Sequence, residues 1–157
     1  MKIKAIFYDF DGVMTNNKVL LSENGNESVF VNRSDGLAVS YFKELKIKQY
    51  IVSTEKNPVV SRRAEKLKID VMQGVQDKAA IIKQIIADEK FSLDNILFIG
   101  NDLNDLEAIN LIPNSFCPND SHARVLESGC TILNISGGDG VIMALYNYII
   151  SQENYHE

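Results

Sequence analysis

Short apolar runs alternate with longer amphipathic segments along almost the whole chain, and this alternation constrains the fold more than any other feature. The apolar runs predict strands at 3–8, 48–53, 69–72, 95–99, 114–116 and 130–133. The intervening segments predict helices at about 35–46, 57–68, 77–90, 103–109, 120–127 and 139–151. We therefore expect an α/β fold, a Rossmann-like doubly wound parallel sheet covered by helices on both faces. Ligands bind such sheets beyond the carboxyl ends of the strands.

One segment interrupts this alternation directly after the first predicted strand. Residues 19–31 contain two apolar runs around Asn24-Gly25, which is a strong hairpin turn signal. We expect a β-hairpin flap at about 17–32 that stands over the site. The chain has 157 residues and no linker or internal repeat, so we expect a single domain, 1–157.

Composition excludes several classes of partner. The formal net charge is −5, which argues against a nucleic-acid partner because phosphate binding normally needs a basic face. The N-terminus lacks the shape of a signal peptide, and no apolar run approaches the roughly 20 residues that span a bilayer. Cys117 and Cys130 form no CxxC pair, which predicts free thiols in a reducing cytoplasm. We expect a cytoplasmic protein with no membrane partner.

Two carboxylates follow the first predicted strand in Asp9-Phe10-Asp11-Gly12. At the carboxyl edge of a parallel sheet, two such groups can hold a divalent cation, and one of them can attack phosphorus. Glycine at the next position allows a sharp turn and a close approach of a ligand to the backbone. The alternative interpretation is that Asp9 and Asp11 only cap the strand and open a turn.

Three further signals follow later predicted strands or open a predicted helix. Ser53 ends the second strand, Lys78 begins a helix, and Gly100-Asn101-Asp102-Leu103-Asn104-Asp105 follows the fourth strand. A hydroxyl can hydrogen-bond a phosphoryl oxygen, and a lysine can balance the charge of a carboxylate and a phosphate. Taken singly, Ser53 also fits an ordinary turn and Lys78 an ordinary surface lysine.

In this order, the four signals resemble the motifs of the haloacid dehalogenase superfamily, whose first motif, DxDGxxT, matches residues 9–15. The resemblance implies phosphoryl transfer through an aspartyl-phosphate. Asp9 would be the nucleophile and Asp11 the general acid. Ser53 and Lys78 would complete the catalytic set.

The same resemblance implies a Mg²⁺ cofactor. Asp9 and the backbone carbonyl of Asp11 would bind the ion, and the third protein ligand would be Asn101 or Asp102. Asn101 stands where many members of the superfamily have their metal-binding aspartate, so on charge we slightly favour Asp102. Asp105 would hold Lys78 or Asn101 in position.

The spacing of the motifs leaves no room for a cap domain, because only about 40 residues separate Asp11 from Ser53. The chain is therefore similar to the capless phosphatases that act on 3-deoxy-manno-octulosonate 8-phosphate or nonulosonate 9-phosphates. This similarity implies a phosphorylated α-keto sugar acid as substrate. It also implies a homotetramer in which the hairpin and the C-terminal segment of neighbouring subunits help to close the site.

The segment after Ser53 resembles the nonulosonate phosphatases, which are marked by a Glu, an Arg and a Lys, here Glu55, Arg63 and Lys66. Arg63 and Lys66 would recognise the substrate carboxylate, and they share a helix face because they are three residues apart. The alternative is a solvated basic face. Thr54, which replaces the usual glycine of the second motif, and Asp35 complete the predicted substrate set, although Asp35 also fits a helix cap.

The leading hypothesis from the sequence is a Mg²⁺-dependent phosphatase for a nonulosonate 9-phosphate of the sialic-acid or 2-keto-3-deoxynononate type. The glycine-rich run 136–141 resembles the tail motif of this group, but no arginine occurs between Gly137 and Tyr148, where octulosonate phosphatases usually have one. An octulosonate 8-phosphate phosphatase stays the alternative enzyme. A low-activity oligomerisation module associated with an acylneuraminate cytidylyltransferase is the third hypothesis, because Asn101 departs from the motif.

Overall fold

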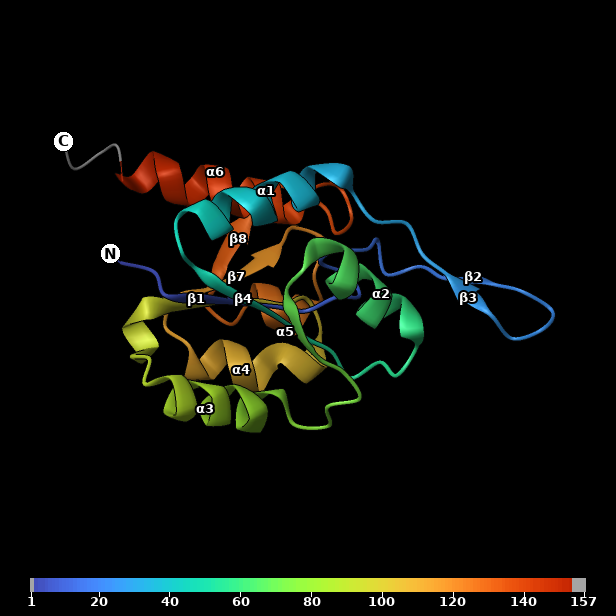
Figure 1. Cartoon of the computed structure of the whole chain (residues 1–157), viewed down its shortest axis with the longest axis horizontal. Helices are drawn as coiled ribbons and strands as arrows, with labels where there is room; N and C mark the ends of the chain where they lie inside the picture. Colours follow the sequence, from blue (N-terminus) through green and yellow to red (C-terminus); the bar gives the residue numbers. More distant parts are fainter. Residues whose placement is uncertain (1, 154–157) are drawn as a thin grey trace.

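The computed structural model describes residues 2–153 and has the predicted α/β architecture (Figure 1). Its main sheet has six strands in the order β5-β4-β1-β6-β7-β8, and every neighbouring pair is parallel. The strands are β1 (Ala5–Tyr8), β4 (Lys48–Val52), β5 (Asp70–Met72), β6 (Ile96–Ile99), β7 (Ser115–Pro118) and β8 (Thr131–Leu133). All six lie within about two residues of the predicted strands.

Helices cover both faces of the sheet, as predicted. They are α1 (Arg33–Glu44), α2 (Pro58–Leu67), α3 (Lys78–Glu89), α4 (Leu106–Leu111), α5 (Ala123–Leu126) and α6 (Val141–Glu153). Helices α1 and α6 pack together on one face, and α3 and α4 lie on the other (Figure 1). The helix expected at 103–109 begins as a separate 3₁₀ turn, η2 (Leu103–Asp105), and a second turn, η1 (Leu93–Asn95), precedes β6.

Each face of the sheet forms its own apolar core. Ile6 and Tyr8 of β1 belong to the core beneath α1, α2 and α6, whereas Ala5 and Phe7 belong to the core beneath α3 and α4. Successive side chains of a strand point to opposite faces. Because both faces are covered, β1 is apolar at all four positions rather than alternating.

The strand order places the switch point of the sheet between β1 and β6. From β1 the chain proceeds outward to β4 and β5, and it then returns to the other side of β1 for β6, β7 and β8. The crossover connections therefore diverge beside the carboxyl ends of β1 and β6, which leaves a crevice for a ligand. Asp9 directly follows β1, and Gly100-Asn101 directly follows β6, so the predicted motifs flank this crevice.

The hairpin expected after the first strand consists of β2 (Leu20–Leu21) and β3 (Glu27–Ser28), which pair antiparallel. It projects from the carboxyl edge of the sheet, away from the body of the molecule (Figure 1). An isolated bridge between Thr15 and Val31 closes its base. Large apolar side chains near its ends are exposed, with 68% of Leu20 and 80% of Phe30 accessible.

Two features bear on the expectations from composition. Cys117 and Cys130 are free, with their sulfur atoms 3.3 Å apart. Within residues 2–153, every helix is too short or too polar to cross a bilayer.

Candidate active site

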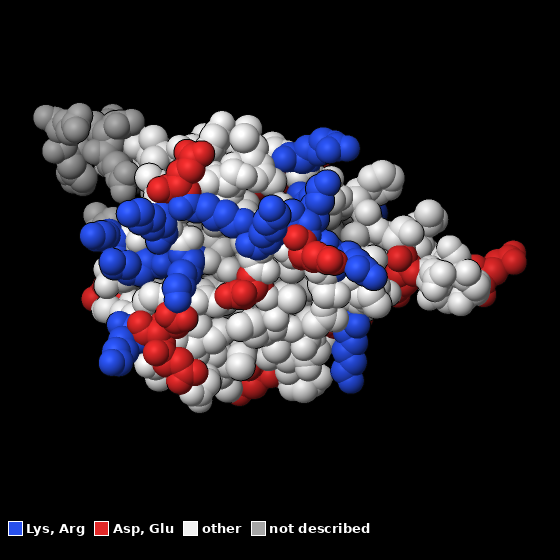
Figure 2. All heavy atoms as spheres, in the orientation of Figure 1, with Lys and Arg blue, Asp and Glu red and all other residues white. Residues whose placement is uncertain are grey.

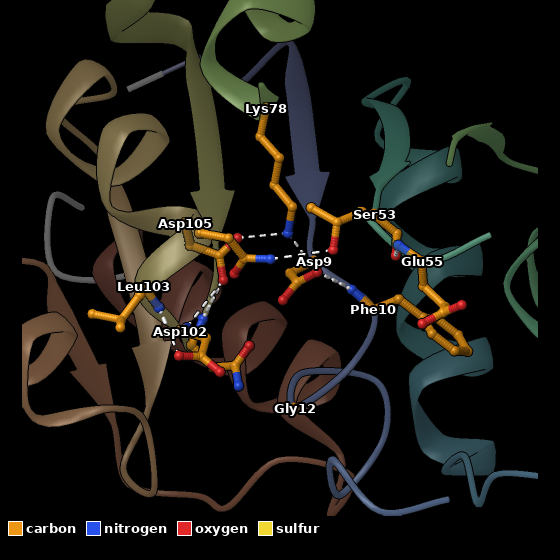
Figure 3. A network of polar contacts seen from close by, with 12 residues as sticks. Asp9, Phe10, Gly12, Ser53, Glu55, Lys78, Asp102, Leu103 and Asp105 are labelled. Atoms are coloured by element: carbon orange, nitrogen blue, oxygen red, sulfur yellow. Dashed lines mark hydrogen bonds and ion pairs between the residues drawn. The ribbon is translucent and has the colours of Figure 1, made fainter. Parts of the chain in front are cut away.

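A buried lysine joins two carboxylates at the carboxyl edge of the sheet (Figure 3). Lys78 Nζ lies 2.7 Å from Asp9 Oδ1 and 2.7 Å from Asp105 Oδ1, and all three side chains are buried. Asp77 places the lysine, because its side chain accepts a hydrogen bond from Ala80 N and caps α3 one residue before Lys78. Burial lowers the pKa of Lys78, but the two carboxylates outweigh it and hold the pKa above its ordinary value. Lys78 therefore stays charged.

The other oxygen of Asp9 faces an amide and a carbonyl. One side-chain amide atom of Asn101 lies 2.8 Å from Asp9 Oδ2 and 2.8 Å from the backbone oxygen of Asp11. With the amide oxygen at this place, a carboxylate, a backbone carbonyl and an amide oxygen converge. With the amide turned by 180°, the nitrogen would donate to both oxygens instead. The all-oxygen set fits Mg²⁺.

The backbone of Asn101 is held from two sides. Its N–H donates to Asp105 Oδ2 at 2.8 Å, and its carbonyl oxygen accepts from the N–H of His122 at 2.8 Å. Asp105 therefore contacts both candidates that the sequence named for it, Lys78 through one oxygen and Asn101 through the other. No role was expected for His122. His122 also caps α5, because its ring nitrogen accepts a hydrogen bond from Arg124 N. The sequence contains no motif that predicts these contacts.

Asp102, which we slightly favoured on charge as the third ligand, makes a local contact. Its Oδ1 accepts a hydrogen bond from Leu103 N at 2.7 Å, and it caps η2. The contacts with Asp9 and Asp11 are made by the Asn101 side chain, and the identity of the third protein ligand stays a prediction. Within the part of the chain that the structure describes, no three His, Cys, Asp or Glu side chains gather as a metal cluster. A site with one carboxylate and two carbonyl-type oxygens does not need such a cluster.

Asp11 and Ser53 complete the predicted catalytic set. Burial, and then the Glu55 carboxylate, raise the pKa of Asp11, while Lys78 acts in the opposite direction. A raised pKa suits a residue that must donate a proton. Ser53 is buried directly after β4, where its hydroxyl accepts from Glu55 N at 3.1 Å. The neighbouring Thr54 hydroxyl accepts from the side-chain amide of Asn104 at 3.3 Å.

Burial and the Asp105 carboxylate raise the pKa of Asp9, and the Lys78 ammonium opposes them. A divalent cation at Asp9 Oδ2 would act in the same direction as Lys78 and favour the ionised carboxylate. A carboxylate must be ionised to act as a nucleophile. Lys78 on one side of Asp9, and a cation bound by the converging oxygens on the other, would both favour the ionised form of the carboxylate.

Glycine is required where the acidic motif passes Asn101. Gly12 has a φ of +85°, and a Cβ at this position would lie 1.9 Å from the Asn101 amide. The C-terminal glycine-rich run packs on the same loop, because a Cβ on Gly137 would lie 2.2 Å from the Gly12 carbonyl oxygen, and Gly138 N donates to Val13 O. The sequence showed the glycines but not their contact with the acidic motif. Only backbone without side chains fits between the two loops.

Thr15 is a further residue of the site that was not among the predicted site residues. It is fully buried, and its hydroxyl accepts hydrogen bonds from Gly12 N at 3.2 Å and Asn17 N at 3.1 Å. These contacts shape the loop that carries Asp11. The signal was present, since threonine is the last residue of the DxDGxxT pattern.

A cavity of about 670 Å³ lies between the hairpin and α2 and reaches Phe10, the neighbour of Asp9. Arg63 and Lys66 line it, together with Arg62. The lining does not include Thr54 or Glu55. Glu55 Oε1 instead accepts hydrogen bonds from the backbone N–H groups of Lys56 and Asn57, at 2.9 and 3.0 Å. The structure thus brings two of the predicted substrate-binding cations to the cavity and gives Glu55 a contact within its own loop.

Asp35 lies elsewhere. It is only 1% exposed, and its Oδ1 accepts from Ile142 N at 3.0 Å and Met143 N at 3.3 Å. It therefore binds the start of α6, whereas Asn32 caps the helix to which Asp35 belongs. These contacts support a capping role, but for a different helix from the one expected, and Asp35 lines neither the hairpin cavity nor the acid–lysine centre. The cause is tertiary, because α1 and α6 meet only in the folded chain.

Known proteins share both this fold and this sequence pattern. The haloacid dehalogenase-like hydrolase family matches residues 37–145. A haloacid dehalogenase family hydrolase of Streptomyces avermitilis, described as putative, is 34% identical with a TM-score of 0.92, covering 97% of this chain and 87% of that one. A 3-deoxy-D-manno-octulosonate 8-phosphate phosphatase of Moraxella catarrhalis, in complex with magnesium, phosphate and the KDO molecule, is 24% identical with a TM-score of 0.91, covering 97% and 88%.

Two curated relatives differ in extent. A 3-deoxy-D-manno-octulosonate 8-phosphate phosphatase of Salmonella typhi is 22% identical over 149 residues, which cover 94% of this chain and 79% of the relative. The N-acylneuraminate cytidylyltransferase A of Danio rerio is 21% identical over 152 residues, but these cover only 35% of that protein. The family match spans more than half of the chain, and the motifs meet at the edge of the sheet. The chain therefore belongs to the haloacid dehalogenase-like hydrolases.

Proposed function

We propose that this chain is a Mg²⁺-dependent phosphatase that hydrolyses the phosphate ester of a keto sugar acid through an aspartyl-phosphate. The observation that carries the proposal is the environment of Asp9. One of its oxygens pairs with Lys78, and the other faces the Asn101 amide and the Asp11 carbonyl. A carboxylate held in this way is neutralised on one side by a lysine and would be neutralised on the other by a bound Mg²⁺. It can then approach a negatively charged phosphate.

The chemistry takes two steps at Asp9. The carboxylate attacks phosphorus, the bond between phosphorus and the sugar oxygen breaks, and Asp11 gives its proton to the leaving oxygen. Asp11 then takes a proton from water, which attacks phosphorus, breaks the acyl phosphate and regenerates the Asp9 carboxylate. The Lys78 ammonium and the Ser53 hydroxyl stabilise the phosphoryl oxygens. Mg²⁺, held by Asp9, the Asp11 carbonyl and Asn101, would supply charge neutralisation.

Within this class, 3-deoxy-manno-octulosonate 8-phosphate is the leading substrate. The curated relative that matches over 79% of its own length is a phosphatase for this compound. This reverses the preference from the sequence, which placed the nonulosonate 9-phosphates first. Arg63 and Lys66, on the wall of the cavity beside Phe10, would recognise the sugar carboxylate.

A nonulosonate 9-phosphate is the second candidate, and one specific observation favours it. Helix α6 and the residues just before it contain no arginine between Gly137 and Tyr148, where octulosonate phosphatases usually have one. A 9-phosphate substrate is one carbon longer, and the cavity between the hairpin and α2 has a volume of about 670 Å³. The distant similarity to an acylneuraminate cytidylyltransferase also favours a nonulosonate substrate.

The assembly that we propose is a homotetramer in which hairpins close neighbouring sites. Its support is the exposed apolar surface of the hairpin, above all Leu20, Leu21 and Phe30. Such surface on a projecting element is typical of an interface. The third hypothesis, a low-activity oligomerisation module, rested on Asn101, and it is less favoured because an Asn101 side-chain oxygen beside Asp9 and the Asp11 carbonyl could still bind Mg²⁺. A cytoplasmic location stays a prediction.

The decisive experiment measures phosphate release from both sugar phosphates with Mg²⁺ and with EDTA. We expect turnover only with Mg²⁺, and a higher kcat/KM for the octulosonate ester. The Asp9→Asn variant should lose activity by several orders of magnitude, whereas Asp88→Asn, on the exposed face of α3, should keep it. Absence of turnover of both esters by a folded chain with intact Asp9 would leave the oligomerisation module as the better hypothesis. Full activity of Asp9→Asn would exclude the aspartyl-phosphate.

A further inference from the structure

A second cavity, of about 360 Å³, lies between α1 and α2 and has an unusual lining. Five of its eight lining residues are cationic and none is acidic: Arg33, Lys43, Arg63, Lys66 and Lys68 line it together with Gly36, Ser40 and Leu67. We call these five side chains the groove cations. Figure 2 shows a band of lysine and arginine across this face, although the chain as a whole carries a net charge of −5.

Within the described part of the chain, none of the groove cations forms an ion pair with a carboxylate. Every ion pair within residues 2–153 involves other cations, namely Lys48, Arg62 and Lys78. Burial lowers the pKa of Arg63, and the Asp35 carboxylate opposes this, but Asp35 is buried and does not line the groove. The positive charge of the groove is therefore free to meet a ligand from solution.

Helix stability explains only part of this arrangement. Lys43 and Lys66 lie in the last turns of α1 and α2, where a cation interacts favourably with the helix dipole, and Lys43 Nζ also donates to the Leu67 carbonyl. Arg33 is the first residue of α1, where the dipole disfavours a cation. Its placement costs helix stability and brings a fifth cation to the groove.

The groove cations also repel one another. Burial, and then Lys68, lower the pKa of Lys43, and burial, with a smaller contribution from Arg33, lowers the pKa of Arg63. The Nε of Arg63 is buried and has no hydrogen-bond partner within the described chain, although its Nη2 donates to Asn32 O at 3.0 Å. A bound anion would relieve this repulsion and supply acceptors.

We propose that the groove between α1 and α2 binds a linear diphosphate or triphosphate group, carried by free polyphosphate or by a nucleotide. A phosphate chain matches several cations spread along a groove, because each phosphoryl unit offers charge and acceptor oxygens. Helix α1, with 12 residues, is about 18 Å long, which accommodates such a chain along its axis. The lining contains no aromatic side chain to stack on a base, so the phosphates and not the base are recognised.

This groove shares two residues with the proposed substrate cavity and extends beyond it in three. Arg33, Lys43 and Lys68 line the groove but not the cavity beside Phe10, whereas Arg63 and Lys66 line both. The three cations outside the substrate cavity therefore distinguish phosphate-chain binding from binding of the substrate. The proposal stands whether the chain proves to be a phosphatase or an oligomerisation module.

The test titrates tripolyphosphate, and separately ATP, into the whole chain in EDTA, and follows binding by calorimetry and by amide chemical shifts. The variant Arg33→Gln with Lys68→Gln removes two groove cations whose side chains make no hydrogen bond or ion pair with the rest of residues 2–153. The control Lys18→Gln with Lys83→Gln removes two exposed cations elsewhere. Thermal unfolding of both double variants checks that each is folded, and Lys68→Gln alone serves if the first does not fold.

We expect the groove variant to weaken tripolyphosphate binding about tenfold or more and the control to change it less than about twofold. The amides of Gly36, Ser40 and Lys68 should shift on binding. Equal weakening in both variants, or shifts confined to the loop of Asp9 and Asp11, would overturn the proposal. Similar affinity for ATP and tripolyphosphate supports recognition of the phosphate chain alone. A strong preference for ATP that survives in the groove variant contradicts it.

Discussion

The buried Lys78 and the groove cations differ in how their positive charge is balanced. Lys78 is almost completely buried and contacts two carboxylates at 2.7 Å each. The groove cations between α1 and α2 are exposed, apart from the half-buried Arg63, and form no ion pair within residues 2–153. A buried charge must be paired, because its lost hydration is not replaced otherwise. A charge at the surface keeps its water and is left available for a ligand. Burial therefore distinguishes cations that must be paired within the fold from cations that are available to bind a ligand.

Removing the buried lysine should have the largest effect on this contrast. Lys78→Met leaves Asp9 and Asp105 buried beside each other without a cation, and we expect the free energy of unfolding to fall by about 3–5 kcal/mol. Urea unfolding at neutral pH in EDTA measures this loss. Lys83→Met is the matched control, since Lys83 lies on the same helix but is exposed. Its stability should stay within about 0.5 kcal/mol of the original chain. Equal losses in both variants would contradict the contrast.

Asp35 tests what burial without an ion pair does. Burial raises its pKa to about 6, and its Oδ2 has no hydrogen-bond partner within the described residues. The folded chain therefore holds this proton more tightly than the unfolded chain, in which the pKa is near the ordinary 3.8. Stability from this group is present below about pH 4 and is lost as the pH rises through about 6, by about 3 kcal/mol.

The Asp35→Asn variant keeps an acceptor for α6 and removes the titration. We expect the stability of the original chain relative to this variant to fall between pH 4 and pH 7, as measured by urea unfolding across this range. A pH-independent difference would show that Asp35 titrates normally in the folded chain.

Adding a charge at the metal position should give a smaller effect with a distinctive sign. Asn101→Asp places a carboxylate beside Asp9 and the Asp11 carbonyl, so we expect a loss of about 1–2 kcal/mol in EDTA. Mg²⁺ should restore stability and raise the melting temperature of this variant more than that of the original chain. Asp102→Asn, at the start of η2, is the comparison variant. If it abolishes stabilisation by Mg²⁺ while Asn101→Asp leaves it unchanged, Asp102 is the ligand.

Removing groove cations should change stability least. The unfolding free energy of the Arg33→Gln, Lys68→Gln variant should lie within about 0.5 kcal/mol of the original chain at physiological ionic strength. At low salt the variant should be slightly more stable than the original chain. Repulsion among the groove cations is least screened under these conditions, and the variant has two fewer of them. A loss of 2 kcal/mol or more, on the order of a core defect, would mean that these cations are structural. They would then resemble Lys78.

Much of the fold was predictable from local patterns. The six strands of the sheet and the hairpin at Asn24-Gly25 occur where apolar runs and turn residues predicted them. Helix ends shifted by a few residues, and the segment at 103–109 split into η2 and α4, because Asp102 and Asp105 cap a tight turn before the helix continues. Such ends depend on side-chain contacts that periodicity does not contain.

Only part of the candidate site could be predicted from the sequence. The meeting of Asp9, Lys78 and Asp105 followed from motifs at the carboxyl edge of a parallel sheet. The contact of the Asn101 side chain with Asp9 and Asp11 did not, because adjacent residues leave a strand in different directions and charge alone pointed to Asp102. Gly137 against Gly12, and Asp35 at the start of α6, are contacts between segments more than 100 residues apart. No local pattern specifies them.

The sequence by itself determined the class of fold, the hairpin, the family and the kind of chemistry, since these depend on apolar periodicity and on motifs in a set order. Only the tertiary structure decided which oxygens surround Asp9, which carboxylate caps α6, and that cations of α1 and α2 form one groove. The physical reason is that periodicity determines which face of each element is buried. The partners that a polar group finds depend on how the elements pack, and burial then decides whether its charge must be paired.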